Sequence, residues 1–124
     1  MSRRFPQRVL SLLRESRMLG IRAGIKPHRF TGIWFVMVGD QVFVRPWNDK
    51  PAGWRRAFLE QPRGAISVSD REIPVCARQV RGERLLDAID AAYAEKYDTK
   101  ASLKWVRGLS TPRRRKTTTE LLPR

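Results

Sequence analysis

Apolar residues alternate with a period of two on both sides of Gly39-Asp40, within the stretch GIWFVMVGDQVFVRPW at residues 32–47. Gly39-Asp40 suits a two-residue type I′ or II′ hairpin turn, because glycine adopts positive φ readily. That turn would pair Val38 with Gln41, Val36 with Phe43, and Trp34 with Arg45. This register puts on one face a wholly apolar set of residues: Ile33, Phe35, Met37, Val42 and Val44.

The opposite face of this hairpin is apolar in its middle and polar at its ends. It carries Trp34, Val36, Val38, Gln41, Phe43 and Arg45. A hairpin with one solvated face alternates cleanly between apolar and polar residues. We therefore expect the second face to be covered by another subunit or by a helix, with Trp34 and Arg45 marking where it turns polar.

Apolar spacings of three and four residues predict the helices. They indicate an N-terminal helix at 6–16, a helix at 51–61 closed by Pro62, a helix at 82–97, and a shorter helical segment at 99–108. The segment TPRRRK that follows, at 111–116, is expected to be a basic loop.

Alternation predicts three further strands. One is at 18–25, with a glycine bend, and two form a second hairpin around Asp70-Arg71. The core face of that hairpin carries Ile66, Val68, Ile73 and Val75. The β-branched stretch TTTELL at 117–122 predicts the last strand.

These elements predict a mainly β fold with flanking helices, in a single domain spanning 1–124. Within it, 1–16 is an N-terminal helix, 17–80 a five-strand barrel body, and 82–124 a helix, a basic loop and the final strand. Several short antiparallel strands favour a small closed barrel, since closure removes exposed strand edges. With 41% apolar residues, the chain has enough material for one core.

The formal net charge of +14 lies at the two ends of the chain. Residues 1–31 hold 8 basic and 1 acidic residue, residues 32–99 hold 10 of each, and residues 100–124 hold 8 and 1. Such ends can bind the phosphates of nucleic acid or of an anionic ligand. The alternative is a solvated surface in an arginine-rich chain, since arginine outnumbers lysine 20 to 6.

Composition also excludes several chemistries. The single cysteine, Cys76, allows neither an internal disulfide framework nor a cysteine-based zinc site, and the single histidine, His28, allows neither a Ser/His/Asp site nor a His-based metal site. We expect no metal. No stretch approaches the roughly 20 apolar residues of a membrane span, and nothing resembles a secretory signal. A cytoplasmic protein without membrane partners is expected.

Several side chains have more than one reading. Lys26 and Arg29 are either phosphate ligands or exposed charges, and His28 is a phosphate ligand, a general acid or a plain loop residue. Trp34 opposite Arg45 is either a wall for a stacked ring or a cross-strand cation–π pair.

Other candidates favour structural roles. Trp54 is expected to anchor its helix in the core, Cys76 to be a half-buried small apolar residue, and Asp87 and Asp90 to lie on a solvated helix face. The run RRRK at 113–116 suits phosphate contacts and equally suits a solvated loop.

The series KPHRFTGIWFVMVGDQVFVRPW, GWRRAFLEQPRGAISVSDREIPVCARQV, AAYAEKY and TTTELLPR resembles small bacterial proteins of unknown function. Those are similar to the FMN-binding split β-barrel (pyridoxamine-phosphate-oxidase-like) proteins and to deazaflavin-dependent nitroreductases. The resemblance covers roughly residues 17–124. It implies a six-stranded antiparallel split β-barrel, commonly a homodimer through the outer barrel face.

The resemblance also implies an FMN or deazaflavin cofactor in a groove outside the barrel, and oxidoreductase activity in which the cofactor carries the hydride. By position, Lys26, His28, Arg29 and Thr31 would form the phosphate-binding turn. Trp34 and Arg45 would line the ring, and Trp54 and Arg55 would come from the adjacent helix.

Two alternatives remain open. One is a basic nucleic-acid-binding module that uses the charged ends of the chain. The other is a dimeric barrel without a cofactor site that binds another small ligand. The second alternative arises because the turn AGIKPHRF, at residues 23–30, replaces the glycine-rich basic turn of the deazaflavin reductases.

Overall fold

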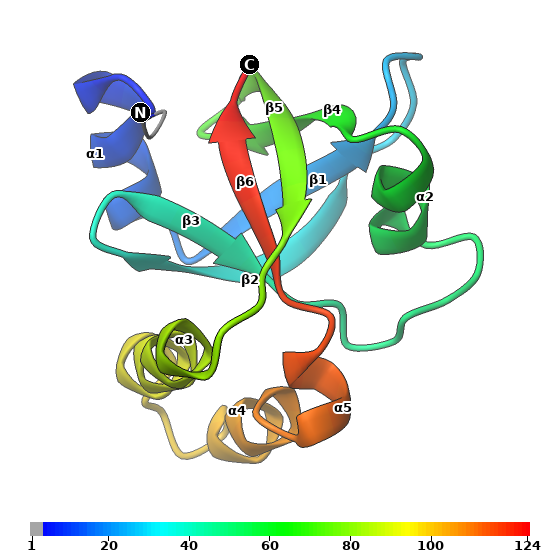
Figure 1. Ribbon diagram of the computed structural model, residues 1–124. Coiled ribbons are helices and arrows are strands. Elements are labelled where there is room, and N and C mark those ends of the chain that lie inside the picture. Colours follow the sequence, from blue (N-terminus) through cyan, green and yellow to red (C-terminus); the bar gives the residue numbers. More distant parts are fainter. Residues whose placement is uncertain (1–3) are drawn as a thin grey trace.

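The computed structural model describes residues 4–124, which form a closed antiparallel barrel with helices around it (Figure 1). Its six strands are β1 (Met18–Ala23), β2 (Thr31–Val38), β3 (Gln41–Val44), β4 (Arg63–Val68), β5 (Arg71–Gln79) and β6 (Thr119–Pro123). They are hydrogen-bonded in the order β1-β2-β3-β6-β5-β4, and β4 pairs with β1 to close the barrel. The predicted six-stranded antiparallel barrel is confirmed.

The helices within residues 4–124 are α1 (Gln7–Glu15), α2 (Trp54–Glu60), α3 (Glu83–Lys96), α4 (Leu103–Leu109) and α5 (Pro112–Arg115). Four of them lie where apolar spacing predicted them. The expected basic loop at 111–116 is wrong in part, because it contains α5. Pro112 is at the first helical position, where its missing N–H costs nothing, and Arg115 N–H donates to the Thr111 carbonyl.

The predicted register of the first hairpin is confirmed along the paired part of β2 and β3. Its pairs are Phe35–Val44, Val36–Phe43, Met37–Val42 and Val38–Gln41. The second hairpin turns one residue earlier than predicted, at Ser69-Asp70, where both residues have positive φ. Aspartate tolerates that conformation better than the arginine that the prediction placed in the turn. The predicted faces of the hairpin are still correct. Ile66 pairs with Ile73, and moving the turn by one residue changes each cross-strand partner by two residues, so the same side chains share a face.

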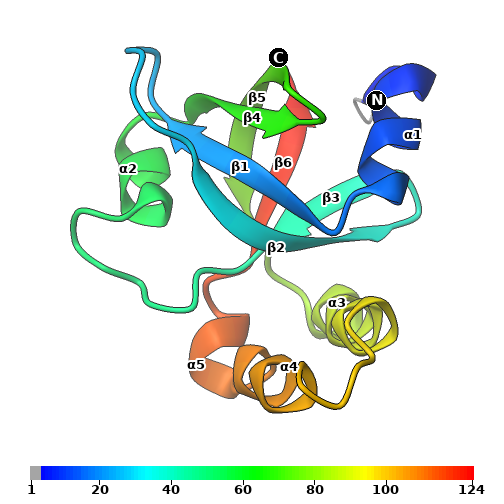
Figure 2. The same ribbon diagram turned by 180° about the vertical axis from the view of Figure 1, so that it is seen from behind.

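Two apolar cores lie on the two sides of the β2–β3 hairpin. Phe35, Val42 and Val44 point into the barrel, where α1 and α2 add Leu13 and Phe58. On the outer side, Val36 and Phe43 pack against α3 and α4 in a second core that contains Leu86, Ile89, Tyr93, Tyr97, Val106 and Leu109. Figure 2 shows α3, α4 and α5 together on this side of the barrel. The expected cover is thus a helix of the same chain, so this face does not require a second subunit.

Candidate functional site

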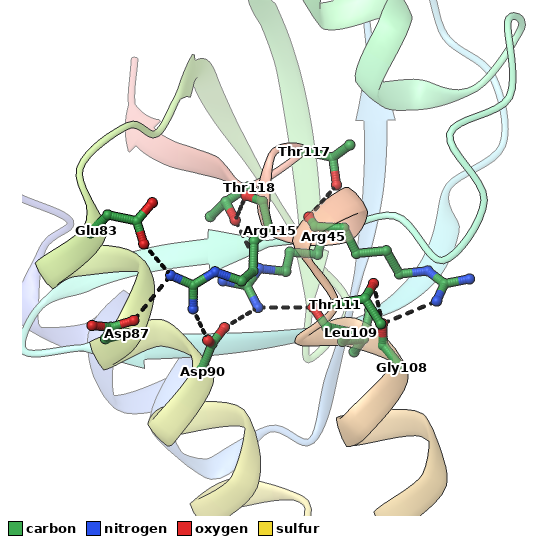
Figure 3. A network of polar contacts seen from close by, with 11 residues as sticks. Arg45, Glu83, Asp87, Asp90, Gly108, Leu109, Thr111, Arg115, Thr117 and Thr118 are labelled. Atoms are coloured by element: carbon green, nitrogen blue, oxygen red, sulfur yellow. Dashed lines mark hydrogen bonds and ion pairs between the residues drawn. The ribbon is translucent and has the colours of Figure 1, made fainter.

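Arg45 follows β3 directly, and its side chain is fully buried between the barrel and the C-terminal helices (Figure 3). Its Nε donates to Thr118 Oγ1 at 2.8 Å, and its Nη1 donates to Asp90 Oδ1 at 2.6 Å and to the Leu109 carbonyl at 3.0 Å. The guanidinium also lies 5.5 Å from the centre of the Tyr93 ring. Arg45 therefore joins three segments, and its guanidinium is directed away from solvent.

Asp90 is the carboxylate that neutralises this buried charge. Its side chain is 23% exposed, and its second oxygen contacts Arg115, which also contacts Glu83 and Asp87. The hydrogen bond to Asp87, supported by Asp90 and Glu83, raises the pKa of Arg115. The expectation of a solvated helix face holds for Asp87, which is 72% exposed, and is wrong for Asp90. The helix turns Asp90 toward the barrel, where Arg45 needs a counter-charge.

Trp34 stacks on Tyr97, with ring centres 4.0 Å apart and planes 4° from parallel. The Tyr97 hydroxyl accepts from Phe35 N–H at 3.0 Å and donates to the Arg17 carbonyl at 2.6 Å, so it joins the end of α3 to the barrel. Burial raises the pKa of Tyr97 above its ordinary range. Of the two readings of Trp34, the cation–π pair with Arg45 is not formed, because Arg45 is held in its own network.

A groove of about 310 Å³, here the tryptophan groove, lies beside this stack. It is lined by Met18, Gly32, Ile33, Trp34, Arg45, Trp47, Trp105 and Leu109. Trp47 and Trp105 meet edge to face at 4.9 Å, and both remain partly exposed. Arg45 borders the groove without offering its side chain, so the surface is aromatic and aliphatic. Such a surface suits a flat apolar ring.

A second hollow of about 530 Å³, here the loop pocket, adjoins the tryptophan groove and shares Ile33 and Trp47 with it. It lies between the β1–β2 loop, the loop before α2, and α2 itself. Its lining includes His28, Arg29, Thr31, Asn48, Lys50 and Trp54. His28 Nε2 lies 2.9 Å from the Ala23 carbonyl, which ties the two ends of the β1–β2 loop together. Arg29 is exposed at the rim.

The predicted site residues are thus distributed over several places. His28, Arg29, Thr31 and Trp54 line the loop pocket, and Trp34 lines the tryptophan groove. Trp54 is half-buried and packs against the barrel core as well, so the structural and lining roles coincide. Lys26 is exposed in the β1–β2 loop outside the lining of both hollows, and Arg55 pairs with Asp49 at 2.8 Å.

Trp47 is the residue that sequence reasoning missed, although it borders both hollows. The Arg114 guanidinium lies 3.6 Å from its ring centre, and Arg114 Nε donates to the Trp47 carbonyl at 2.8 Å. A Cβ on Gly108 would lie 2.4 Å from the far edge of this ring, so glycine leaves the space that the indole uses. The signal in the sequence was a tryptophan directly outside an otherwise paired hairpin.

Lys96 occupies a further partly buried position on α3. Its Nζ donates to the Phe35 carbonyl at 2.9 Å and lies 3.3 Å from the centre of the Phe35 ring. Burial, together with the nearby charge of Arg17, lowers the pKa of Lys96 to about 8. Within residues 4–124, no group of three or more His, Cys, Asp or Glu side chains is arranged to hold a metal ion.

The fold and the site together define a small closed β-barrel protein whose outer face carries C-terminal helices and an aromatic groove. The chain belongs to the family described as "Uncharacterized protein conserved in bacteria (DUF2255)", whose model matches residues 14–121. The uncharacterised bacterial part of the predicted resemblance is confirmed. No helix in the described part of the chain has both the length and the apolar character needed to cross a membrane.

The structure is similar to the crystal structure of the conserved hypothetical protein Rv2991 from Mycobacterium tuberculosis. The TM-score is 0.58 and the sequence identity 14%, over 97% of this chain and 80% of that chain. At this identity the similarity shows the fold alone. The comparison with curated proteins finds no match. None of these findings shows a flavin or deazaflavin relationship.

Proposed function

We propose that the chain binds a phosphate-bearing aromatic cofactor of the FMN or deazaflavin type and acts as an oxidoreductase. One observation carries the proposal: the tryptophan groove and the loop pocket adjoin through Ile33 and Trp47. The first is aromatic and the second is bordered by Arg29 and Lys50. A flat ring with an anionic tail has these two characters at its two ends, and hollows of this size are typical of small-molecule sites.

In this proposal the ring lies in the tryptophan groove and its phosphate lies in the loop pocket. Arg29 donates charge-assisted hydrogen bonds to the phosphate. His28 uses Nε2 on the Ala23 carbonyl, so Nδ1 is the ring atom left for a ligand. The cofactor supplies the hydride chemistry, and the protein orients the ring and excludes water from one face.

The test is a titration of the purified protein with FMN and with a deazaflavin at low salt, followed by quenching of tryptophan fluorescence and by the visible spectrum. We expect saturable binding of one of them at tens of micromolar. If neither binds at such concentrations, the cofactor proposal is wrong. Reduction of an electron acceptor by the bound, reduced cofactor then tests the oxidoreductase activity.

Two variants locate the site. Arg29→Gln is expected to weaken cofactor binding about tenfold, which corresponds to one charge-assisted hydrogen bond. Gly108→Ala is expected to displace the Trp47 ring and weaken binding without unfolding the protein, since the clash is with the far end of a side chain. Arg8→Gln, an equal charge change on the exposed side of α1, is the matched control. Equal losses in Arg29→Gln and the control would place the ligand elsewhere.

A further inference from the structure

A third cavity, of about 330 Å³, lies between the loop after β3, the start of α2, and the α5 region. Its lining includes five cations, Arg55, Arg56, Arg113, Arg114 and Lys116, and one carboxylate, Asp49. Five positive charges and one negative charge leave a formal charge of +4. We call this cavity the basic pocket. Its cations come from two segments that are widely separated in the sequence, so the basic run at 113–116 alone does not account for the charge.

Three of the five cations already have partners. Arg55 Nη1 and Arg56 Nε both contact the same oxygen of Asp49, at 2.8 and 3.2 Å. Arg114 donates to the carbonyls of Trp47 and Gly108, at 2.8 and 3.0 Å. One carboxylate, Asp49, is therefore shared by two arginines, and Arg114 contacts two carbonyls and the Trp47 ring without a carboxylate partner among residues 4–124.

Arg113 and Lys116 are the cations without a partner. Among residues 4–124, neither side chain makes an ion pair or a hydrogen bond. They are three residues apart around α5, a spacing that brings helical neighbours together. Like charges held at a concave surface repel one another and focus a positive potential there, and a bound anion relieves that repulsion.

We propose that the basic pocket binds a compact polyanion with two or more phosphate groups. Phosphate is favoured because arginine guanidinium groups match its oxygens with paired donors. A small ligand is favoured over a nucleic-acid strand because the pocket offers no free aromatic face for a base. Trp47 is its aromatic wall, and that ring already has the Arg114 guanidinium 3.6 Å from its centre and an edge contact with Trp105, which leaves the residue 39% exposed. The basic pocket adjoins the loop pocket through Pro46, Trp47 and Asn48, but none of its five cations lines the proposed cofactor site, so the proposal does not depend on that site.

The experiment is isothermal titration calorimetry of the full chain with orthophosphate, pyrophosphate and tripolyphosphate, each at low and high salt. We expect affinity to rise at least about tenfold from orthophosphate to tripolyphosphate, as further phosphates engage further cations, and to fall as salt increases. The double variant Arg113→Gln/Lys116→Gln is expected to lower tripolyphosphate affinity at least about tenfold. Its melting temperature without ligand should not fall, because both side chains are exposed and unpaired and their removal lowers the repulsion among the cations.

The matched control is Arg8→Gln/Lys100→Gln, which removes the same two charges at exposed positions outside the basic pocket. It should leave the affinity within about twofold. No binding of tripolyphosphate, or equal losses in both double variants, would overturn the proposal. A short single-stranded oligonucleotide that binds more tightly than tripolyphosphate and is lost in the pocket variant would replace it with a nucleic-acid site. Failure of FMN and deazaflavin to bind leaves the proposal unaffected.

Discussion

At the scale of the residue, Arg45 organises the outer face of the barrel. Its guanidinium reaches Asp90 on α3, Leu109 at the end of α4, and Thr118 before β6. Burying an arginine is costly unless its charge is paired and its N–H groups are hydrogen-bonded. The carboxylate of Asp90 supplies the charge and shares the Nε and Nη1 donors with the Leu109 carbonyl and the Thr118 hydroxyl, while Nη2 has no hydrogen-bond partner among residues 4–124.

Asp90→Asn tests this dependence. The substitution keeps the shape of the side chain and removes its charge, which leaves the guanidinium of Arg45 buried without its carboxylate. We expect the free energy of unfolding, measured with urea, to fall by about 3 kcal/mol. Asp87→Asn is the control on the same helix with the same Arg115 partner, and its exposed pair should change stability by less than about 1 kcal/mol. Similar losses in both variants would show that Arg45 does not need Asp90.

At the scale of the element, α2 packs against the barrel where a strand lacks a side chain. A Cβ on Gly64 in β4 would lie 2.4 Å from the Arg22 carbonyl oxygen and 2.7 Å from the Phe58 ring. Phe58 is the buried residue of α2 and reaches the barrel core. Spacing predicted the helix and its Trp54–Ala57–Phe58 face, but the need for glycine at position 64 follows from how closely β1, β4 and α2 approach.

Gly64→Ala is therefore expected to destabilise the protein by about 1–3 kcal/mol, the usual cost of overpacking. The clash involves backbone of β1, which cannot move aside without breaking strand pairing. Gly32→Ala in β2 is the control, because its Cβ would meet only the end of Met18 at 3.5 Å. The control should change the unfolding free energy by less than about 1 kcal/mol. A neutral result for Gly64→Ala would mean that both the β1 backbone and α2 can shift to admit the methyl group.

At the scale of the whole molecule, ion pairs offset part of the positive charge at the two ends of the chain. Arg4 and Arg14 both contact Asp40 in the hairpin turn, and Arg115 contacts three acidic residues of α3. Two of the cations that remain unpaired, Arg113 and Lys116, lie in the basic pocket, which joins the middle and the end of the sequence. Charge counting predicted an anionic partner as one reading, and only the folded arrangement locates where such a partner would bind.

Stability should rise from about pH 8 and pass through a maximum near pH 10. Burial lowers the pKa of Lys96 to about 8 from 10.5 in the unfolded chain, so the unfolded state binds more protons between these values and stability rises with pH. Burial raises the pKa of Tyr93 and Tyr97 above the unfolded value of 10.0. Stability from the two tyrosines is complete below pH 10 and is lost above it.

Urea unfolding across roughly pH 7 to pH 11 measures this profile. Lys96→Met should remove the rising part and leave the fall above pH 10 intact. In that variant the Tyr97 hydroxyl, 2.7 Å from the Phe35 carbonyl, is the donor that this carbonyl shares with the Arg17 carbonyl. A variant whose stability still rises between pH 8 and pH 10 would show that another group is responsible.

The amino-acid sequence by itself determined the strands, the main helices and the register of the first hairpin. These depend on side-chain period and on turn residues that lie next to one another in the chain. It also predicted that both faces of that hairpin are covered, and it placed four candidate residues that prove to line one pocket. Local patterns contain this information because each element buries one face.

Only the tertiary structure decided which surfaces come together. Arg45 is joined to partners 45, 64 and 73 residues away, and Trp34 stacks on a tyrosine at the far end of α3. The placement of Trp47 depends on Gly108 and Arg114, and the basic pocket depends on the loop after β3 meeting α5. Such contacts follow from how the helices pack against the closed barrel, and packing of separate elements leaves no period in the sequence.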